Sequence, residues 1–141
     1  MRVIATWNGR EADPPLRVPA NALVVPWLSY SKTMPRCDLV VTHGGHGTLM
    51  RALACGRPVV ASPAGGDMAE NAARADWAGL GVRLPGRLCT PTGVRLAVGR
   101  ALARPALRER AEGVARWIAA ADAPGRACEE LERWARSPGT R

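Results

Sequence analysis

One short stretch of the sequence combines residue types that bind a phosphate group. It reads H-G-G-H-G-T from His43 to Thr48, between an apolar run and an amphipathic run. Glycines let the backbone turn tightly and approach an anion, and the free N–H groups at a helix start attract negative charge. The Thr48 hydroxyl and the His43 imidazole can each add a hydrogen bond to a phosphate oxygen. The pattern predicts a diphosphate site, although glycine clusters also occur simply to make a turn.

Other phosphate and metal motifs fit this stretch less well. The dinucleotide pattern G-x-G-x-x-G fails because Met50 occupies the third glycine position, and the P-loop fails because no lysine precedes the threonine. A metal site of His43, His46 and Asp67 is disfavoured, since the chain has only two histidines and no further carboxylate nearby in sequence. We therefore expect no metal site and no cofactor.

The surrounding sequence predicts alternating strands and helices. The expected strands are Val3–Trp7, Ala22–Trp27, Asp38–His43, Val59–Ser62 and Gly81–Leu84. The expected helices are Thr48–Cys55, Asp67–Gly79, Pro91–Ala103, Pro105–Ala121 and Arg126–Arg136. The third strand is continuously apolar, as expected of a parallel strand covered on both faces. This order predicts an α/β fold, a Rossmann-like parallel sheet with helices on both faces and a helical carboxy-terminal tail over 91–141. Its ligands would bind at the carboxyl ends of the strands.

Length and composition narrow the possible functions. The 141 residues suffice for one domain over 1–141. The net charge is +8, but the basic residues are scattered singly, and one Tyr with no Phe gives no aromatic set to stack bases. We therefore expect no nucleic-acid partner. No apolar run approaches the roughly 20 residues that span a bilayer, and the amino terminus lacks a signal-peptide pattern, so we expect a cytoplasmic protein with no membrane partner.

The four cysteines are Cys37, Cys55, Cys89 and Cys128, and they form no C-x-x-C pair. This spacing favours neither a zinc site nor a disulfide framework. We expect buried apolar thiols.

Several further motifs follow the H-G-G-x-G-T block in a fixed order. They are Ala52-Leu53, Gly56-x-Pro58, Pro63-x-x-x-Asp67, Asn71-Ala72-x-Arg74 and Gly79-x-Gly81. With these motifs and the sixteen-residue step from Trp27 to His43, the chain resembles the nucleotide-sugar glycosyltransferases of GT-B fold. That family includes UDP-glucosyltransferases and the macrolide and glycopeptide-antibiotic glycosyltransferases. The resemblance runs from about Trp27 to Leu84 and implies the carboxy-terminal, donor-binding half of a GT-B fold.

The resemblance implies a role for each matching residue. Trp27 would stack on the donor's base, and the backbone of Leu28 would hydrogen-bond to that base. The residues that would bind the diphosphate are His43, Gly44, Gly45, Gly47 and Thr48. Asp67 would contact hydroxyls of the transferred sugar. The sequence leaves two alternatives open. Trp27 would be an ordinary core residue, and Asp67 would be a helix cap, in a capping box with Glu70.

Four residues, at three places in the chain, depart from the family pattern. Ser29-Tyr30 stands in place of Pro-Gln after the tryptophan, and Met68 in place of Gln after Asp67. Arg51 stands where many members have a ribose-binding Glu, and a guanidinium cannot accept hydrogen bonds from ribose hydroxyls. The donor is therefore left open between a UDP-sugar and a TDP-sugar.

The resemblance also implies that parts of the whole enzyme lie outside this chain. Complete family members have a second, amino-terminal Rossmann-like domain that holds the acceptor site and the catalytic base. By this resemblance the chain would begin at the second strand of its own domain, without the central first strand, so the strands at Val3 and Leu39 would flank a gap or pair directly. We expect a glycosyltransferase of hexosyltransferase type, with no catalytic residue in this chain and no activity without an amino-terminal acceptor-binding domain or subunit. The alternative is a non-catalytic or split nucleotide-sugar-binding subunit.

Overall fold

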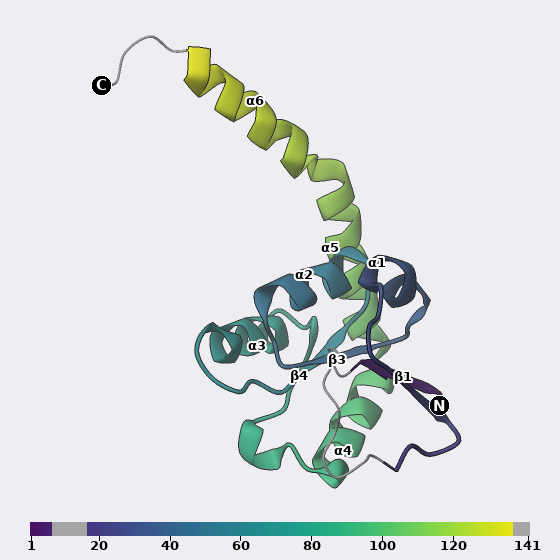
Figure 1. Cartoon of the computed structure of the whole chain (residues 1–141). Coiled ribbons are helices and arrows are strands. Elements are labelled where there is room, and N and C mark those ends of the chain that lie inside the picture. Colours follow the sequence, from purple (N-terminus) through teal and green to yellow (C-terminus); the bar gives the residue numbers. More distant parts are fainter. Residues whose placement is uncertain (7–16, 137–141) are drawn as a thin grey trace.

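The computed structural model describes residues 1–6 and 17–136 and contains the predicted alternation of strands and helices (Figure 1). The strands are β1 (Val3–Thr6), β2 (Ala22–Val25), β3 (Val40–Thr42), β4 (Val59–Ala61) and β5 (Gly81–Arg83). The α-helices are α1 (Tyr30–Thr33), α2 (His46–Ala54), α3 (Asp67–Trp77), α4 (Pro91–Leu102), α5 (Pro105–Ala121) and α6 (Ala123–Arg136). Two short 3-10 helices are η1 (Met34–Arg36) and η2 (Gly86–Leu88). The predicted α/β class is confirmed, whereas α1, η1 and η2 were not predicted. Residue Trp7, placed in the first strand, lies outside the described residues.

The described strands form two separate parallel sheets. One contains β1 and β2, and the other has the order β3-β4-β5, with Val59 opposite both Val40 and Gly81. β1 is not hydrogen-bonded to β3, so direct pairing of these strands was the wrong alternative; the two strands belong to separate sheets. β3 is therefore at the edge of its described sheet. Its Val41 side chain is 52% exposed, which corrects the expectation of a strand covered on both faces.

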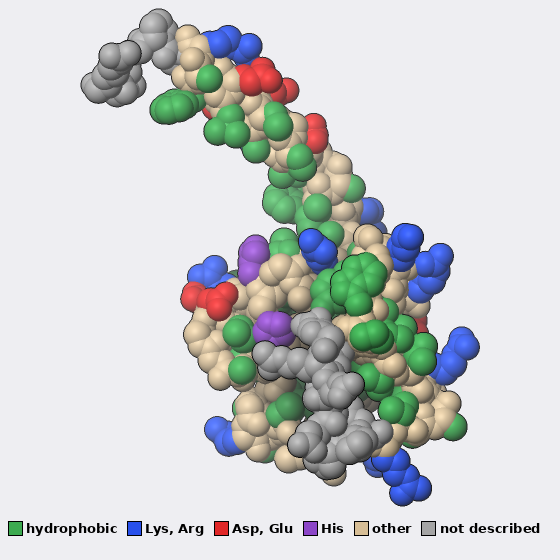
Figure 2. Space-filling model, in the orientation of Figure 1, with side chains coloured by type: hydrophobic (Ala, Val, Ile, Leu, Met, Phe, Trp, Pro, Cys, Tyr) green, Lys and Arg blue, Asp and Glu red, His purple; other side chains and the backbone are tan. Residues whose placement is uncertain are grey.

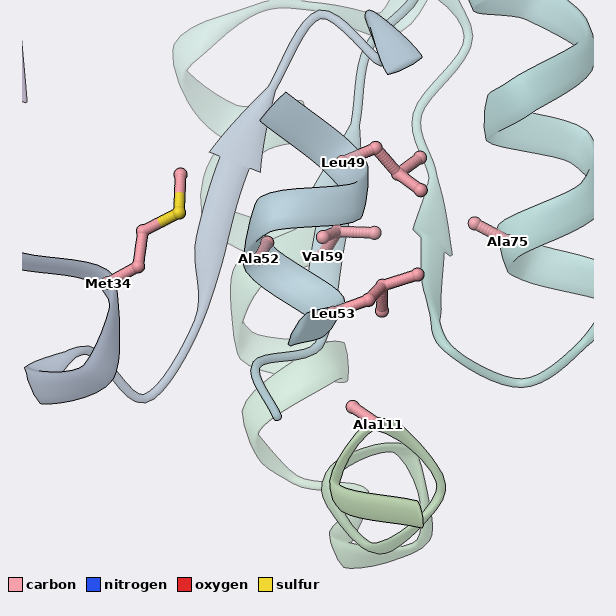
Figure 3. Packing of buried hydrophobic residues seen from close by; sticks show 7 residues of the cluster. All are labelled: Met34, Leu49, Ala52, Leu53, Val59, Ala75 and Ala111. Carbon is pink, nitrogen blue, oxygen red and sulfur yellow. The ribbon is translucent and has the colours of Figure 1, made fainter. Parts of the chain in front are cut away.

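Strand β4 forms the centre of the core, and its successive side chains point to opposite faces. Val59 faces a cluster built with α2, α3 and α5 (Figure 3), and Val60 faces a second cluster built with β5, α4 and α5. The first cluster contains Met34, Leu49, Ala52, Leu53, Val59, Ala75 and Ala111. The second contains Val60, Val82, Leu84, Ala97, Val98, Ala101 and Leu107. Helices therefore cover both faces of this sheet, as predicted.

Helix ends near the core follow local sequence signals. Gly56 adopts a φ of +68° directly after the Cys55 cap of α2, a conformation that stops a helix and that other residues adopt with strain. At the start of α4, the Thr90 hydroxyl accepts a 3.1 Å hydrogen bond from Gly93 N–H, and Pro91 occupies the first helical position. Both ends lie where the sequence predicts them.

The end of α5 and helix α6 project away from the sheets (Figure 1). Asp122 takes a left-handed φ of 39° between α5 and α6. No residue of α6 is buried, and Trp134 is 75% exposed. Figure 2 shows hydrophobic side chains gathered along one side of this projection. In the described part of the chain, no helix is both long and apolar enough to span a bilayer.

The four cysteines are free thiols with different environments. Cys89 and Cys128 are exposed, so the expectation of buried thiols is wrong for these two, while Cys37 and Cys55 are partly buried. Burial raises the pKa of the Cys37 thiol above its ordinary value.

Candidate functional site

The glycine-rich turn leads from the carboxyl end of β3 into α2. Gly45 is the N-cap of α2 and has no side chain that could accept a hydrogen bond from the helix. Leu49 N–H donates to the Gly45 carbonyl at 3.1 Å, which is the first bond of the helical ladder. The preceding amides of His46, Gly47 and Thr48 have no partner in that ladder. They form the kind of helix start that binds an anion.

Gly44 shapes this turn from the inside. It is buried with a φ of +89°, and a Cβ on it would lie 3.1 Å from the Met68 carbonyl oxygen. Its N–H donates to the Thr42 hydroxyl at 3.2 Å, and its carbonyl accepts from the Asn71 amide at 3.2 Å. The geometry therefore gives Gly44 a role in forming the turn.

His43 and Gly45 lie against each other. A Cβ on Gly45 would lie 2.6 Å from His43 Nε2, so any larger residue there would displace the exposed imidazole. A Cβ on Gly47 would meet no atom within 4 Å, so this glycine leaves open space instead of avoiding a clash with the described residues. Both histidines of the chain are visible at the surface in Figure 2. Thr48 is partly buried in the first turn.

Asp67 lies at the neighbouring strand end, after β4. Gly66 is the N-cap of α3 and no side chain caps that helix, so the capping box of Asp67 with Glu70 is wrong. Glu70 instead accepts from Arg74 Nε at 3.1 Å. The exposed Asp67 carboxylate accepts from Asn71 Nδ2 at 3.2 Å, and the same amide donates to the Gly44 carbonyl.

Asn71 therefore connects Asp67 with the glycine-rich turn. The sequence motifs predict no separate role for Asn71. Its position four residues after Asp67 was the available signal, because residues at this spacing face each other on a helix.

A pocket of about 360 Å³ lies between the segment after β2 and helix α2. It is lined by Trp27, Leu28, Ser29, Tyr30, Ser31 and Arg51. Trp27 is 74% exposed, so its interpretation as an ordinary core residue is wrong. Tyr30 and the neighbouring Met34 pack into the buried cluster that includes Leu49 and Leu53 of α2. The same helix thus carries both the glycine-rich start and one wall of the pocket.

A second hollow, of about 400 Å³, is lined by Ala78, Leu80, Arg110, Gly113, Val114 and Trp117. Ala78 follows α3 and Leu80 precedes β5, so this hollow is at the amino ends of the strands, whereas ligands of open α/β sheets bind at the carboxyl ends. Its Arg110 guanidinium donates to the Ala78 carbonyl at 3.1 Å. The candidate site is therefore the glycine-rich turn with the Trp27 pocket. Within residues 1–6 and 17–136, no group of three or more His, Cys, Asp or Glu could hold a metal ion.

These features define the carboxy-terminal half of a GT-B glycosyltransferase fold. The solved structure of the spinosyn forosaminyltransferase SpnP matches 96% of this chain and 35% of its own, with a TM-score of 0.85 and 24% identity. More particularly, the chain belongs to the family of the erythromycin biosynthesis protein CIII-like C-terminal domain, whose model matches residues 1–133.

Curated relatives agree with this family. The chain is 36% identical over 131 residues to 4'-demethylrebeccamycin synthase of Lentzea aerocolonigenes, covering 92% of this chain and 30% of the relative. It is 34% identical over 107 residues to UDP-glycosyltransferase 2 of Phaeomoniella chlamydospora, covering 76% of this chain and 24% of the relative. The chain thus spans 24–30% of the length of these relatives.

Proposed function

We propose that this chain binds a nucleoside diphosphate sugar as the donor-binding half of a glycosyltransferase. The observation that carries the proposal is the placement of an exposed tryptophan pocket beside an uncapped helix start, after the carboxyl ends of the parallel strands β2 and β3. An aromatic face suits a base, and uncapped amides suit a diphosphate. Membership of a family of glycosyltransferase domains supports the same ligand.

Each part of the donor has a matching part of the site. Trp27 stacks on the base, an interaction typically worth about 1–3 kcal/mol, and the Leu28 backbone hydrogen-bonds to it. His43, Thr48 and the amides from Gly44 to Gly47 surround the diphosphate. Asp67, tethered by Asn71 to the glycine-rich turn, contacts hydroxyls of the transferred sugar.

The reaction of the whole enzyme is an inverting transfer of a hexosyl group. A base in the amino-terminal acceptor domain takes the proton of an acceptor hydroxyl, whose oxygen forms a bond to the anomeric carbon. The bond from that carbon to the phosphate oxygen breaks, and its electron pair leaves with the nucleoside diphosphate. The start of α2 stabilises this developing charge with oriented N–H groups. No residue of this chain acts as the base.

The names of relatives support both candidate donors, and the name of the 3-alpha-mycarosylerythronolide B desosaminyl transferase of Saccharopolyspora erythraea, 32% identical over 139 residues, supports a small-molecule acceptor. One relative is a UDP-glycosyltransferase, and another, 33% identical over 135 residues, is the TDP-daunosamine transferase DnrS of Streptomyces peucetius. We therefore propose a UDP- or TDP-sugar donor without choosing between them. The alternative is a non-catalytic or split subunit that binds the nucleotide sugar and needs a separate acceptor-binding partner.

Calorimetric titration of the chain with UDP, TDP and their glucose conjugates tests the proposal. We expect saturable binding of at least one diphosphate, unchanged by EDTA because the helix amides and not a metal hold the anion. Absence of binding by all four ligands would overturn the proposal. Mixing the chain with the amino-terminal domain of a relative then separates a catalytically competent donor-binding half, whether fused or split, from a non-catalytic subunit, since only the competent half gains transferase activity.

A further inference from the structure

Arg51 is placed to contact whatever binds at the start of α2. It lies three residues after Thr48 and four after Gly47, spacings that put all three on one helix face. Helical side chains lean toward the amino-terminal end of their helix, so Arg51 extends back over that first turn. It also lines the Trp27 pocket, where it is the charged member of the six described lining residues.

The Arg51 guanidinium is not committed elsewhere among the residues that the structure describes. Arg74 and Arg108 form ion pairs with Glu70 and Glu112, and no such partner occurs for Arg51 within residues 1–6 and 17–136. Its side chain is exposed at the pocket. The five N–H donors of this group are therefore available to a ligand.

The hydrogen-bond donors and acceptors of the pocket distinguish ribose hydroxyls from phosphate oxygens as partners. Ribose hydroxyls both donate and accept hydrogen bonds, and the Ser29 and Ser31 hydroxyls, 3.2 Å apart, can do the same. A guanidinium only donates, and phosphate oxygens only accept. The planar fork of donors also matches two oxygens of one phosphate. The partner that fits Arg51 is thus the diphosphate.

We propose that Arg51 binds the diphosphate of the donor, together with the amides of α2; the proposal rests on the nucleotide binding proposed above. When the bond to the sugar breaks, the diphosphate gains negative charge, which the guanidinium stabilises further. Arg51 therefore favours the nucleoside diphosphate product over the nucleotide sugar.

The test compares ligands that differ only in the number of phosphates. We titrate uridine, UMP and UDP into the wild-type chain and into the Arg51→Gln variant, and in parallel thymidine, TMP and TDP. Binding of the two nucleosides, uridine and thymidine, is followed by ligand-observed NMR. We expect a loss of about tenfold or more for the diphosphate, a smaller loss for the monophosphate and no change for the nucleoside. The Arg51→Lys variant keeps the charge and should retain part of the diphosphate affinity.

Arg100→Gln is the matched control, because Arg100 is also an exposed helical arginine but lies on α4, which packs on β4 and β5. It should bind all three ligands as the wild type does. An equal loss for nucleoside and diphosphate in Arg51→Gln would assign Arg51 to the base or ribose and overturn the proposal, as would unchanged diphosphate affinity. If the wild type binds none of the six ligands, the proposed function fails as well.

Discussion

Replacing Gly47 by alanine should make the protein more stable and its nucleotide binding weaker. Glycine in a helix is roughly 0.5–1 kcal/mol less favourable than alanine, because it loses more backbone freedom on folding. Gly47 lies within α2, and a Cβ there would meet no atom within 4 Å. We therefore expect Gly47→Ala to gain about 0.5–1 kcal/mol of unfolding free energy, or about 2–4 °C in Tm.

The added methyl group would occupy the space through which an anion reaches the first amides of α2. Losing one hydrogen bond to a charged group costs about 1.5–3 kcal/mol, so diphosphate affinity should fall about 10- to 100-fold. Thermal denaturation of the ligand-free chain and calorimetric titration with UDP and TDP measure the two effects separately. A gain in stability together with a loss of diphosphate affinity would indicate that Gly47 is needed for ligand binding and not for folding.

Gly99 of α4 offers a matched control. A Cβ there also meets nothing within 4 Å, and the residue lies inside a helix away from the site. Gly99→Ala should give the same gain in stability with unchanged affinity. If the Gly47→Ala variant binds nucleotide like the wild type, the ligand does not approach this helix start. If the variant is less stable than the wild type, Gly47 is required for folding.

Five further substitutions test other parts of the site and the core beside it. His43→Ala and Thr48→Ala should each weaken calorimetrically measured diphosphate binding by about 1–3 kcal/mol, and unchanged affinity in both would contradict the diphosphate assignment. Trp27→Phe should abolish the tryptophan fluorescence quenching on nucleotide binding; persistence of the full signal would assign it to another tryptophan. Gly44→Ala should lower the urea-measured stability by about 1–3 kcal/mol, because its φ of +89° strains any other residue, and a wild-type midpoint would refute this. Met34→Ala should cost about 2–5 kcal/mol by the same measurement, since Met34 is 4% exposed in the core; a loss below that range would show that the site collapses around the smaller residue.

The regular elements and the glycine-rich turn could be predicted because their signals are local. Apolar runs, Gly56 and the Thr90-Pro91 pair fix strands and helix ends within a few residues of where they occur. Helix α1 and the adjoining η1 have four and three residues, too few to show a periodic pattern. Gly66, with a φ of 57°, is the N-cap of α3, one residue before the predicted cap Asp67, and the Asp67 carboxylate accepts from Asn71 instead.

Features set by long-range contacts could not be read from local patterns. The exposure of Val41 follows from the place of β3 at the edge of its described sheet, and pairing partners are not encoded within a strand. Cys128 is exposed because no residue of α6 is buried in the described structure, although its neighbours predict a helix. The meeting of Asn71 with the Gly44 carbonyl joins two segments 27 residues apart, and only the fold reveals it.

The two halves of the candidate site are held together by side-chain packing and not by the sheet. The Trp27 segment follows β2 and the glycine-rich turn follows β3, and these strands belong to different sheets. Met34 bridges them, since it packs in one cluster with α2 residues, and Arg57, just after α2, donates to the Pro35 carbonyl at 2.6 Å. The distance between the base pocket and the diphosphate amides therefore depends on a few contacts around η1. A core substitution at Met34 should for this reason weaken nucleotide binding even where the chain remains folded, although Met34 does not line the pocket.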